Sequence, residues 1–63
     1  MNYKLVNHEI GWYRCFKGSE DEAIKEIERL SQFHASRFIL CDDRGKVIGR
    51  TYIPEPTYVF LRG

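Results

Sequence analysis

Two histidines and two cysteines in this 63-residue chain raise the question of a zinc site. They recur at one spacing, because six residues separate His8 from Cys15 and six separate His34 from Cys41. Two histidines and two cysteines make a complete ligand set for zinc. Zinc folds, however, usually take their ligands in pairs about two to five residues apart, so that a short loop wraps the metal. We therefore expect no metal site and two reduced, unligated cysteines.

The same residues could form a cysteine–histidine nucleophilic pair. Such a pair needs an activating base, an orienting group and a pocket, and nothing in the sequence marks Cys15 or Cys41 as activated. Cys41 has apolar neighbours and fits a small core residue. His34 fits a partner for the carbonyl groups at a helix end. We expect no catalytic residue, no cofactor and no enzymatic activity.

The segment CDDRGKVIGR, residues 41–50, raises the question of a phosphate-binding loop. Such a loop needs a helix N-terminus directly after its glycine-rich turn, whereas Lys46 here opens a segment typical of a strand. An acid first and a glycine last, as in Asp42 to Gly45, is typical of a type I turn with the glycine in the left-handed region. The segment therefore predicts a hairpin turn.

The remaining pattern predicts a small antiparallel domain. Ser19 and Glu22 form a capping box at the start of an amphipathic helix over residues 19–34. Pro54 and Pro56 interrupt the sheet, since proline cannot donate to a strand ladder. We predict a single α+β domain over residues 1–63, in ββαββ order, with one helix packed on one face of the sheet. The predicted strands cover residues 3–7, 10–16, 37–42 and 46–53, with residues 58–61 as a fifth strand at an edge.

Charge and composition narrow the function classes. The net charge is +1, but the segment 19–28 carries five acids and one base, so the rest of the chain is at +5. No run of about 18 apolar residues is present, and the N-terminus lacks the pattern of a signal peptide. Two cysteines are too few for the disulfide plan of small secreted domains. We expect a cytoplasmic protein without a membrane partner.

Strand alternation indicates where a binding surface lies. An unpaired arginine is costly to bury, so we place Arg14 and Arg50 on the sheet face away from the helix. That choice turns Tyr13 and Cys15 inward, together with Val47, Gly49, Thr51 and Ile53. The predicted partner-binding residues on the open face are Trp12, Arg14, Phe16, Arg50 and Tyr52. In the alternative, Trp12 and Phe16 belong to the core and Arg14 reaches solvent at its rim.

Exposed aromatic residues beside arginine are typical of protein interfaces. We therefore expect a protein-interaction module, an inhibitor, adaptor or modulator of another protein, of the kind common among phage and mobile-element accessory proteins. The alternative is a nucleic-acid-binding domain that uses the same basic face, with the acidic helix turned away. The strand over residues 58–61 could also pair with its own copy to give a homodimer.

Overall fold

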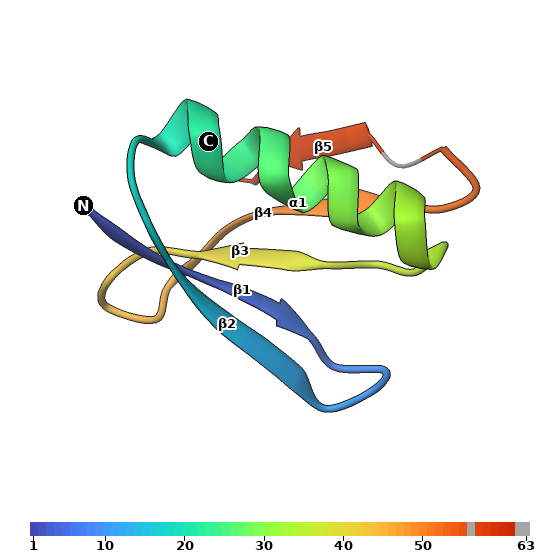
Figure 1. The fold of residues 1–63 in the computed structure, drawn as a ribbon, viewed down its shortest axis with the longest axis horizontal. Helices are drawn as coiled ribbons and strands as arrows, with labels where there is room; N and C mark the ends of the chain where they lie inside the picture. Colours follow the sequence, from blue (N-terminus) through green and yellow to red (C-terminus); the bar gives the residue numbers. More distant parts are fainter. Residues whose placement is uncertain (56, 62–63) are drawn as a thin grey trace.

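The computed structural model describes residues 1–55 and 57–61 and confirms the predicted fold class. Five antiparallel strands form one sheet, and a single helix packs against it (Figure 1). The predicted fifth strand is present. In chain order the elements are β1 (Asn2–Asn7), β2 (Trp12–Lys17), α1 (Glu20–His34), β3 (Ile39–Cys41), β4 (Val47–Tyr52) and β5 (Thr57–Phe60).

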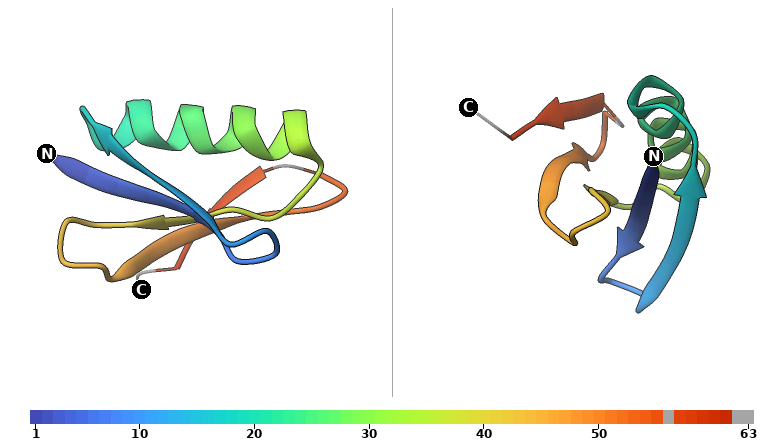
Figure 2. Two further views of the ribbon diagram at one scale, coloured as in Figure 1. Left: turned by 60° about the horizontal axis from the view of Figure 1, so that its bottom comes forward. Right: turned by 90° about the vertical axis from the view of Figure 1, so that its left-hand side faces the viewer.

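The strands lie in the order β2-β1-β3-β4-β5, so β2 and β5 form the two edges. The sheet is strongly twisted, and α1 lies against one side of it (Figure 2). We call this side the covered face. Within the described residues no helix lies on the other side, which we call the open face.

Local sequence signals set the bounds of α1. Ser19 is the N-cap, and it forms the predicted capping box with Glu22. The helix ends at His34, and its C-cap residue Ala35 takes the left-handed conformation with φ of 50°. The buried stripe of α1 consists of Ala23, Ile27, Leu30 and Ser31.

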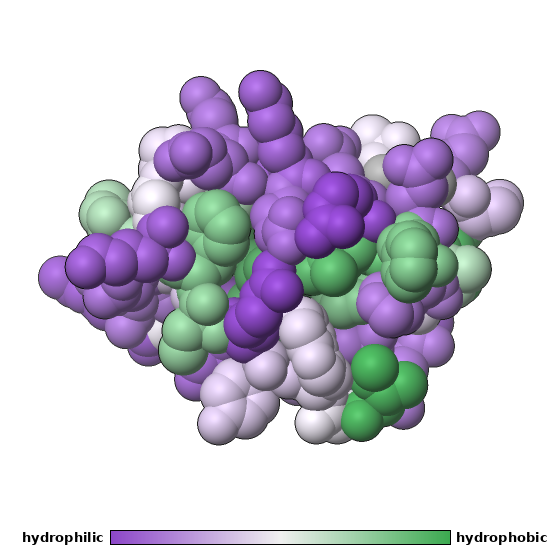
Figure 3. Space-filling view, in the orientation of Figure 1, coloured by the Kyte–Doolittle hydropathy of each residue, from purple (hydrophilic) through white to green (hydrophobic). Residues whose placement is uncertain are grey.

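The hydrophobic core lies between this stripe and the covered face. Figure 3 shows the helix side of the molecule, with a hydrophilic outer surface over α1 and hydrophobic residues gathered in a band below it. Two hydrogen bonds in this layer involve buried polar residues: Asn7 donates to Ser36 at 2.7 Å, and Phe38 N donates to the Thr51 hydroxyl at 2.9 Å. The sheet and the segment before β3 supply Tyr3, Leu5, Phe38, Leu40 and Ile48.

The predicted orientation of the β2 side chains is wrong. Trp12 pairs with Asn7, Arg14 with Leu5 and Phe16 with Tyr3, and the β1 partners are all buried on the covered face. Because directly paired residues share a face, Trp12, Arg14 and Phe16 lie on the helix side of the sheet.

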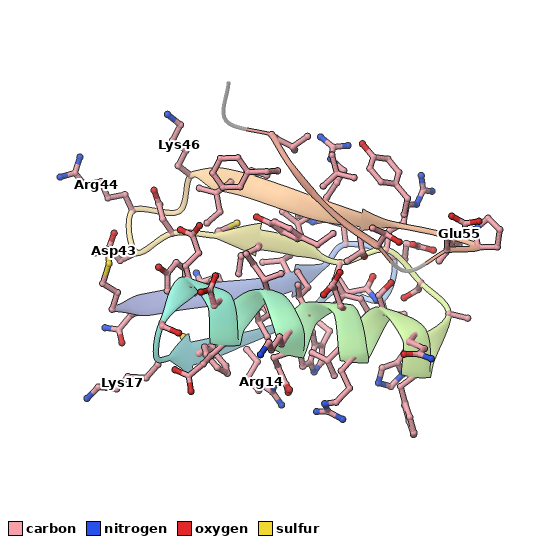
Figure 4. All side chains as sticks on the ribbon, turned by 90° about the horizontal axis from the view of Figure 1, so that it is seen from above. Arg14, Lys17, Asp43, Arg44, Lys46 and Glu55 are labelled. Atoms are coloured by element: carbon pink, nitrogen blue, oxygen red, sulfur yellow. The ribbon has the colours of Figure 1, made fainter. Side chains whose placement is uncertain are left out.

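The error has a physical cause. Burial of an unpaired charge was the reason to turn Arg14 outward, but β2 is an edge strand beside the helix. Arg14 there keeps 45% of its side chain exposed and pairs with Glu26 of α1. Trp12 and Phe16 pack against the core, as the alternative interpretation had it. Figure 4 shows Arg14 beside α1.

The predicted face of β4 is correct in part. Gly49 and Thr51 are buried on the covered face, as expected. A bulge near the start of the strand reverses the assignment there, so Ile48 is buried and Val47 is 40% exposed. Ile53, predicted to point inward, is 42% exposed.

The predicted hairpin turn between β3 and β4 is confirmed. Gly45 N donates to Asp42 O at 3.0 Å, and Gly45 has a φ of 84°. The Asp42 carboxylate accepts from Arg44 N and Lys46 N, both at 2.9 Å. These bonds hold the pKa of Asp42 below its usual value, the Lys46 bond most of all. The interruption of the sheet predicted around the prolines is present at Pro54, whereas Pro56 lies outside the described residues.

Candidate functional site

The open face presents a row of side chains that crosses all five strands. Tyr13 pairs with Val6, Val6 with Ile39, Ile39 with Arg50, and Arg50 with Val59. These pairs run in order from β2 to β5, and their side chains share the open face. The row is aliphatic at its centre, and it has a tyrosine near one end and an arginine near the other.

A second row lies beside the first. Lys4 of β1 pairs with Cys15 on one side and with Cys41 on the other, and Cys41 pairs with Val47. Lys4 Nζ lies 5.2 Å from the centre of the Tyr13 ring, which links the two rows through a cation–π contact. Cys15 is exposed, whereas Cys41 is buried, and burial raises the pKa of the Cys41 thiol.

The exposed residues of this face combine aromatic, aliphatic and cationic side chains. Tyr13 is 65% exposed, Tyr52 43%, and Val47 and Val59 40% each. Lys4, Lys17 and Arg50 supply positive charge, because each lies on the open face of its strand. No acid occupies an open-face position in the described strands.

The acids lie elsewhere, chiefly on α1. Glu20, Asp21 and Glu22 occupy its first turn, where the helix dipole favours negative charge. Glu26 accepts from Arg29 at 3.0 and 2.8 Å and pairs with Arg14, and these bonds lower its pKa, with the Arg29 bond first in size. The acidic helix and the cationic open face are therefore on opposite sides of the molecule.

A shallow depression of about 210 Å³ ends the open face near the β1–β2 turn. It is lined by His8, Glu9, Arg37, Ile39 and Arg50. Glu9 lies within 3.8 Å of the Arg37 guanidinium and accepts from Arg37 N at 3.2 Å. Within the depression Glu9 therefore faces Arg37, and Arg50 forms no ion pair with the described residues.

A larger cavity, of about 640 Å³, lies away from this face. Its lining consists of Ser31, Gln32, Ala35, Ile53 and Pro54, none of which is an acid or a base. The Ser31 hydroxyl donates to Ser36 O at 2.6 Å, and this bond holds the segment after α1 against the helix. The cavity offers no general base and no activated nucleophile.

The structure divides the predicted site residues between the two faces. Arg50 and Tyr52 lie on the open face, as predicted, whereas Trp12, Arg14 and Phe16 lie on the covered face. His8 lies in a turn and His34 at the end of α1. Among the described residues no group of three or more histidines, cysteines or acids comes close enough to hold a metal ion.

Sequence reasoning missed Lys4 and Tyr13, which lie on the open face. The signal for Lys4 was present in YKLVN, because Tyr3 and Leu5 inside require Lys4 outside. Tyr13 would then follow from antiparallel pairing with β1.

Comparison with protein-family models, with curated proteins and with solved structures finds no match to this chain. Among the described residues no helix is long and apolar enough to cross a membrane.

Proposed function

We propose that this chain binds a partner protein through the open face of its sheet, and that the partner surface is acidic around an apolar centre. The row Tyr13, Val6, Ile39, Arg50 and Val59 is the observation that carries this proposal. It gives an aliphatic centre with polar, aromatic and cationic groups around it, which is the composition of a protein interface.

Charge complementarity defines the partner. Lys4, Lys17 and Arg50 lie on a face whose described strand positions hold no acid, so a partner needs carboxylates to match them. Such charges mainly speed association and select the partner. The binding energy would come from Tyr13, Tyr52 and Arg50, since tyrosine and arginine dominate the residues that carry most interface energy.

The arrangement of the rings favours protein over nucleic acid. Stacking platforms for bases place aromatic rings where successive bases reach them. Here Tyr13 lies on β2 and Tyr52 on β4, with β1 and β3 between them, a separation of about 14 Å at the usual strand spacing. The positions between them are aliphatic, as at Val6 and Ile39.

A reducing, cytoplasmic setting forms part of the proposal. Cys15 and Cys41 both pair with Lys4, so two strand spacings, or about 10 Å, separate them. A disulfide needs Cα atoms within about 7 Å, so the fold does not join these thiols to each other. Both are free cysteines in the structure.

The test compares two charge-reversed variants of equal net charge. Lys4→Glu with Arg50→Glu changes the open face, whereas Lys25→Glu with Arg44→Glu changes α1 and the β3–β4 turn. Arg44 projects away from the body of the protein at that turn (Figure 4). A protein captured from nuclease-treated host lysate by the wild-type chain would be purified, and its dissociation constant measured for all three chains. We expect the open-face variant to bind at least about tenfold more weakly, equivalent to about 1.4 kcal/mol.

The control variant should bind like the wild type. Equal weakening by both variants would show that only overall charge matters and would overturn the proposal. Loss of capture after nuclease treatment, with affinity for single-stranded nucleic acid that falls steeply with salt, would instead support the nucleic-acid alternative.

A further inference from the structure

The edge strand β2 points a set of backbone groups away from the sheet. Gly18 N donates to Met1 O at 3.0 Å, which fixes the hydrogen-bonded positions of the β1–β2 pair. Hydrogen-bonded and non-hydrogen-bonded pairs alternate in an antiparallel ladder. The backbone groups of Trp12, Arg14 and Phe16 therefore face β1, and those of the alternate residues, Tyr13, Cys15 and Lys17, face outward.

The two edges of the sheet differ in how they are protected. At β5 the Glu28 carboxylate of α1 accepts from Tyr58 N at 3.1 Å, so the helix occupies part of that edge. At β2, within the part of the chain that the structure describes, no such bond to the outward backbone of Tyr13, Cys15 or Lys17 is present. An edge of this length with unpaired donors and acceptors is a template for another strand.

We propose that β2 pairs with β2 of a second copy of this chain, antiparallel, about a two-fold axis at Cys15. The outward residues then form the hydrogen-bonded pairs of the new ladder: Tyr13 with Lys17 of the second copy, Cys15 with its own counterpart, and Lys17 with Tyr13. The two sheets become one, and their open faces join.

The side chains of β2 are self-complementary in this register. On the open face each Lys17 meets a Tyr13 ring, the same kind of pair that Lys4 and Tyr13 form within one chain. A shift by one step in one direction places Arg14 opposite Arg14, and like charges directly opposite are destabilising. A shift in the other direction moves Tyr13 past the end of the partner strand and shortens the ladder. The sequence of β2 thus selects a second copy and a single register.

Sedimentation of the reduced protein tests the pairing. We expect a concentration-dependent dimer for the wild type. Cys15→Glu places two carboxylates at the two-fold axis and should weaken the dimer by about tenfold or more. Cys15→Thr keeps a small side chain without charge and should leave the dimer intact. Cys15 is exposed, so far-ultraviolet circular dichroism should report the same fold for all three.

Oxidation with diamide tests the register. Directly opposed Cys15 residues have Cα atoms about 5.5 Å apart, which is within the range that a disulfide spans. The two thiols would lose two electrons and two protons to diamide, which is reduced to its hydrazine, and one sulfur–sulfur bond would form. A matched control, Cys15→Ser with Thr57→Cys, carries its exposed thiol on β5 at the other edge. We expect the Cys15 pair to cross-link at least about tenfold faster than the control.

Each result decides the proposal. A wild-type chain that stays monomeric at about 1 mM would overturn it, since the dimer would then be weaker than any specific association. It would also be overturned if Cys15→Glu dimerised as well as the wild type, or if the two thiols cross-linked at equal rates. Partner binding by the open face is read from a different measurement, so the two proposals can fail separately.

Discussion

The two faces of the sheet are built from the same strands but are stabilised in different ways. On the covered face Leu5, Leu40 and the facing Ile27 of α1 have no exposed surface, and the Thr51 hydroxyl bonds the chain at Phe38. On the open face Tyr13 and Tyr52 remain 65% and 43% exposed. One face thus carries the fold, and the other presents large side chains that the fold does not use.

Charge follows a different division from burial. The covered face holds Arg14 at its β2 margin, where Glu26 pairs with it. The open face holds Lys4 and Arg50 with no acid among its described strand positions. The cost of burying its charge therefore does not decide on which face an arginine lies in so small a sheet. At the edge strand β2, an arginine on the covered face still reaches solvent. What distinguishes the faces is that Arg14 forms an ion pair, whereas Lys4 and Arg50 form none with the residues that the structure describes.

A large loss of stability is expected for a change at Gly49 on the covered face. A Cβ at this position would overlap the ring and hydroxyl of Tyr58, which crosses it from β5. Gly49→Ala should displace Tyr58 from the core margin and destabilise the fold by about 3 kcal/mol, the upper end of overpacking effects. Urea unfolding measures this.

Two further variants show whether the overlap is the cause. Tyr58→Ala with Gly49→Ala should lose less stability than the sum of the single changes, because the overlap is absent once the ring is removed. Additive losses would mean that Tyr58 does not lie over Gly49, and the description of this margin would be wrong.

Neighbouring residues of β3 give the sharpest comparison of the faces. Leu40 is fully buried on the covered face, and Leu40→Ala should cost about 2–5 kcal/mol by leaving a cavity. Ile39 is half-buried on the open face. Ile39→Ala should cost about 1 kcal/mol, because the substitution removes less buried apolar surface than Leu40→Ala does. Thermal unfolding of both variants checks this order. If Ile39→Ala proved as costly as Leu40→Ala, the open face would be part of the core.

Much of the fold could be predicted from sequence, because its signals are local. The capping box at Ser19, the stripe of α1 and the turn at Asp42 to Gly45 each depend on residues a few positions apart. The physics of each is complete within one segment. The structure confirms the capping box and the turn, and it confirms the stripe as far as Leu30, after which Phe33 is 80% exposed and Ser31 is buried instead. The class and order of the elements follow from them.

The face of β2 could not be predicted by the same means. It depends on pairing with β1 and on a turn in which Gly11 has a φ of 64°, so that the strand starts at Trp12 rather than at Ile10. The partner of Arg14 is Glu26, twelve residues away on another element. Because side chains alternate between the two faces, a shift of one residue in a strand reverses the face of every side chain in it. The bulge beside Val47 has this effect at the start of β4.

The turn before β4 decides which of its residues belong to each face, and a change there should have a moderate effect. Gly45 has a φ of 84° and open space around its Cα, so Gly45→Ala adds strain without a collision. We expect a loss of about 1 kcal/mol in urea unfolding. Gly45→Asn is the matched control, since asparagine tolerates the left-handed region, and it should lose less. Equal stability of Gly45→Ala and wild type would contradict the turn geometry.

The smallest expected effect concerns the charge pair at the margin of the covered face. Arg14 and Glu26 are partly exposed, so their coupling should be only about 0.2–1 kcal/mol at neutral pH. A double-mutant cycle with Arg14→Gln and Glu26→Gln, read by urea unfolding, measures it.

The folded state lowers the pKa of Glu26 below its usual 4.5, chiefly through the Arg29 bond and then through Arg14. A lowered pKa means that this stabilisation is fully present above about pH 4.5 and is lost as the pH falls through the folded value. The coupling should therefore disappear in acid, where Glu26 is protonated, while Leu40→Ala keeps its full cost. A coupling that persisted in acid would show that Arg14 is held on the covered face by packing against Trp12, whose ring centre lies 5.8 Å from the guanidinium carbon, rather than by its charge.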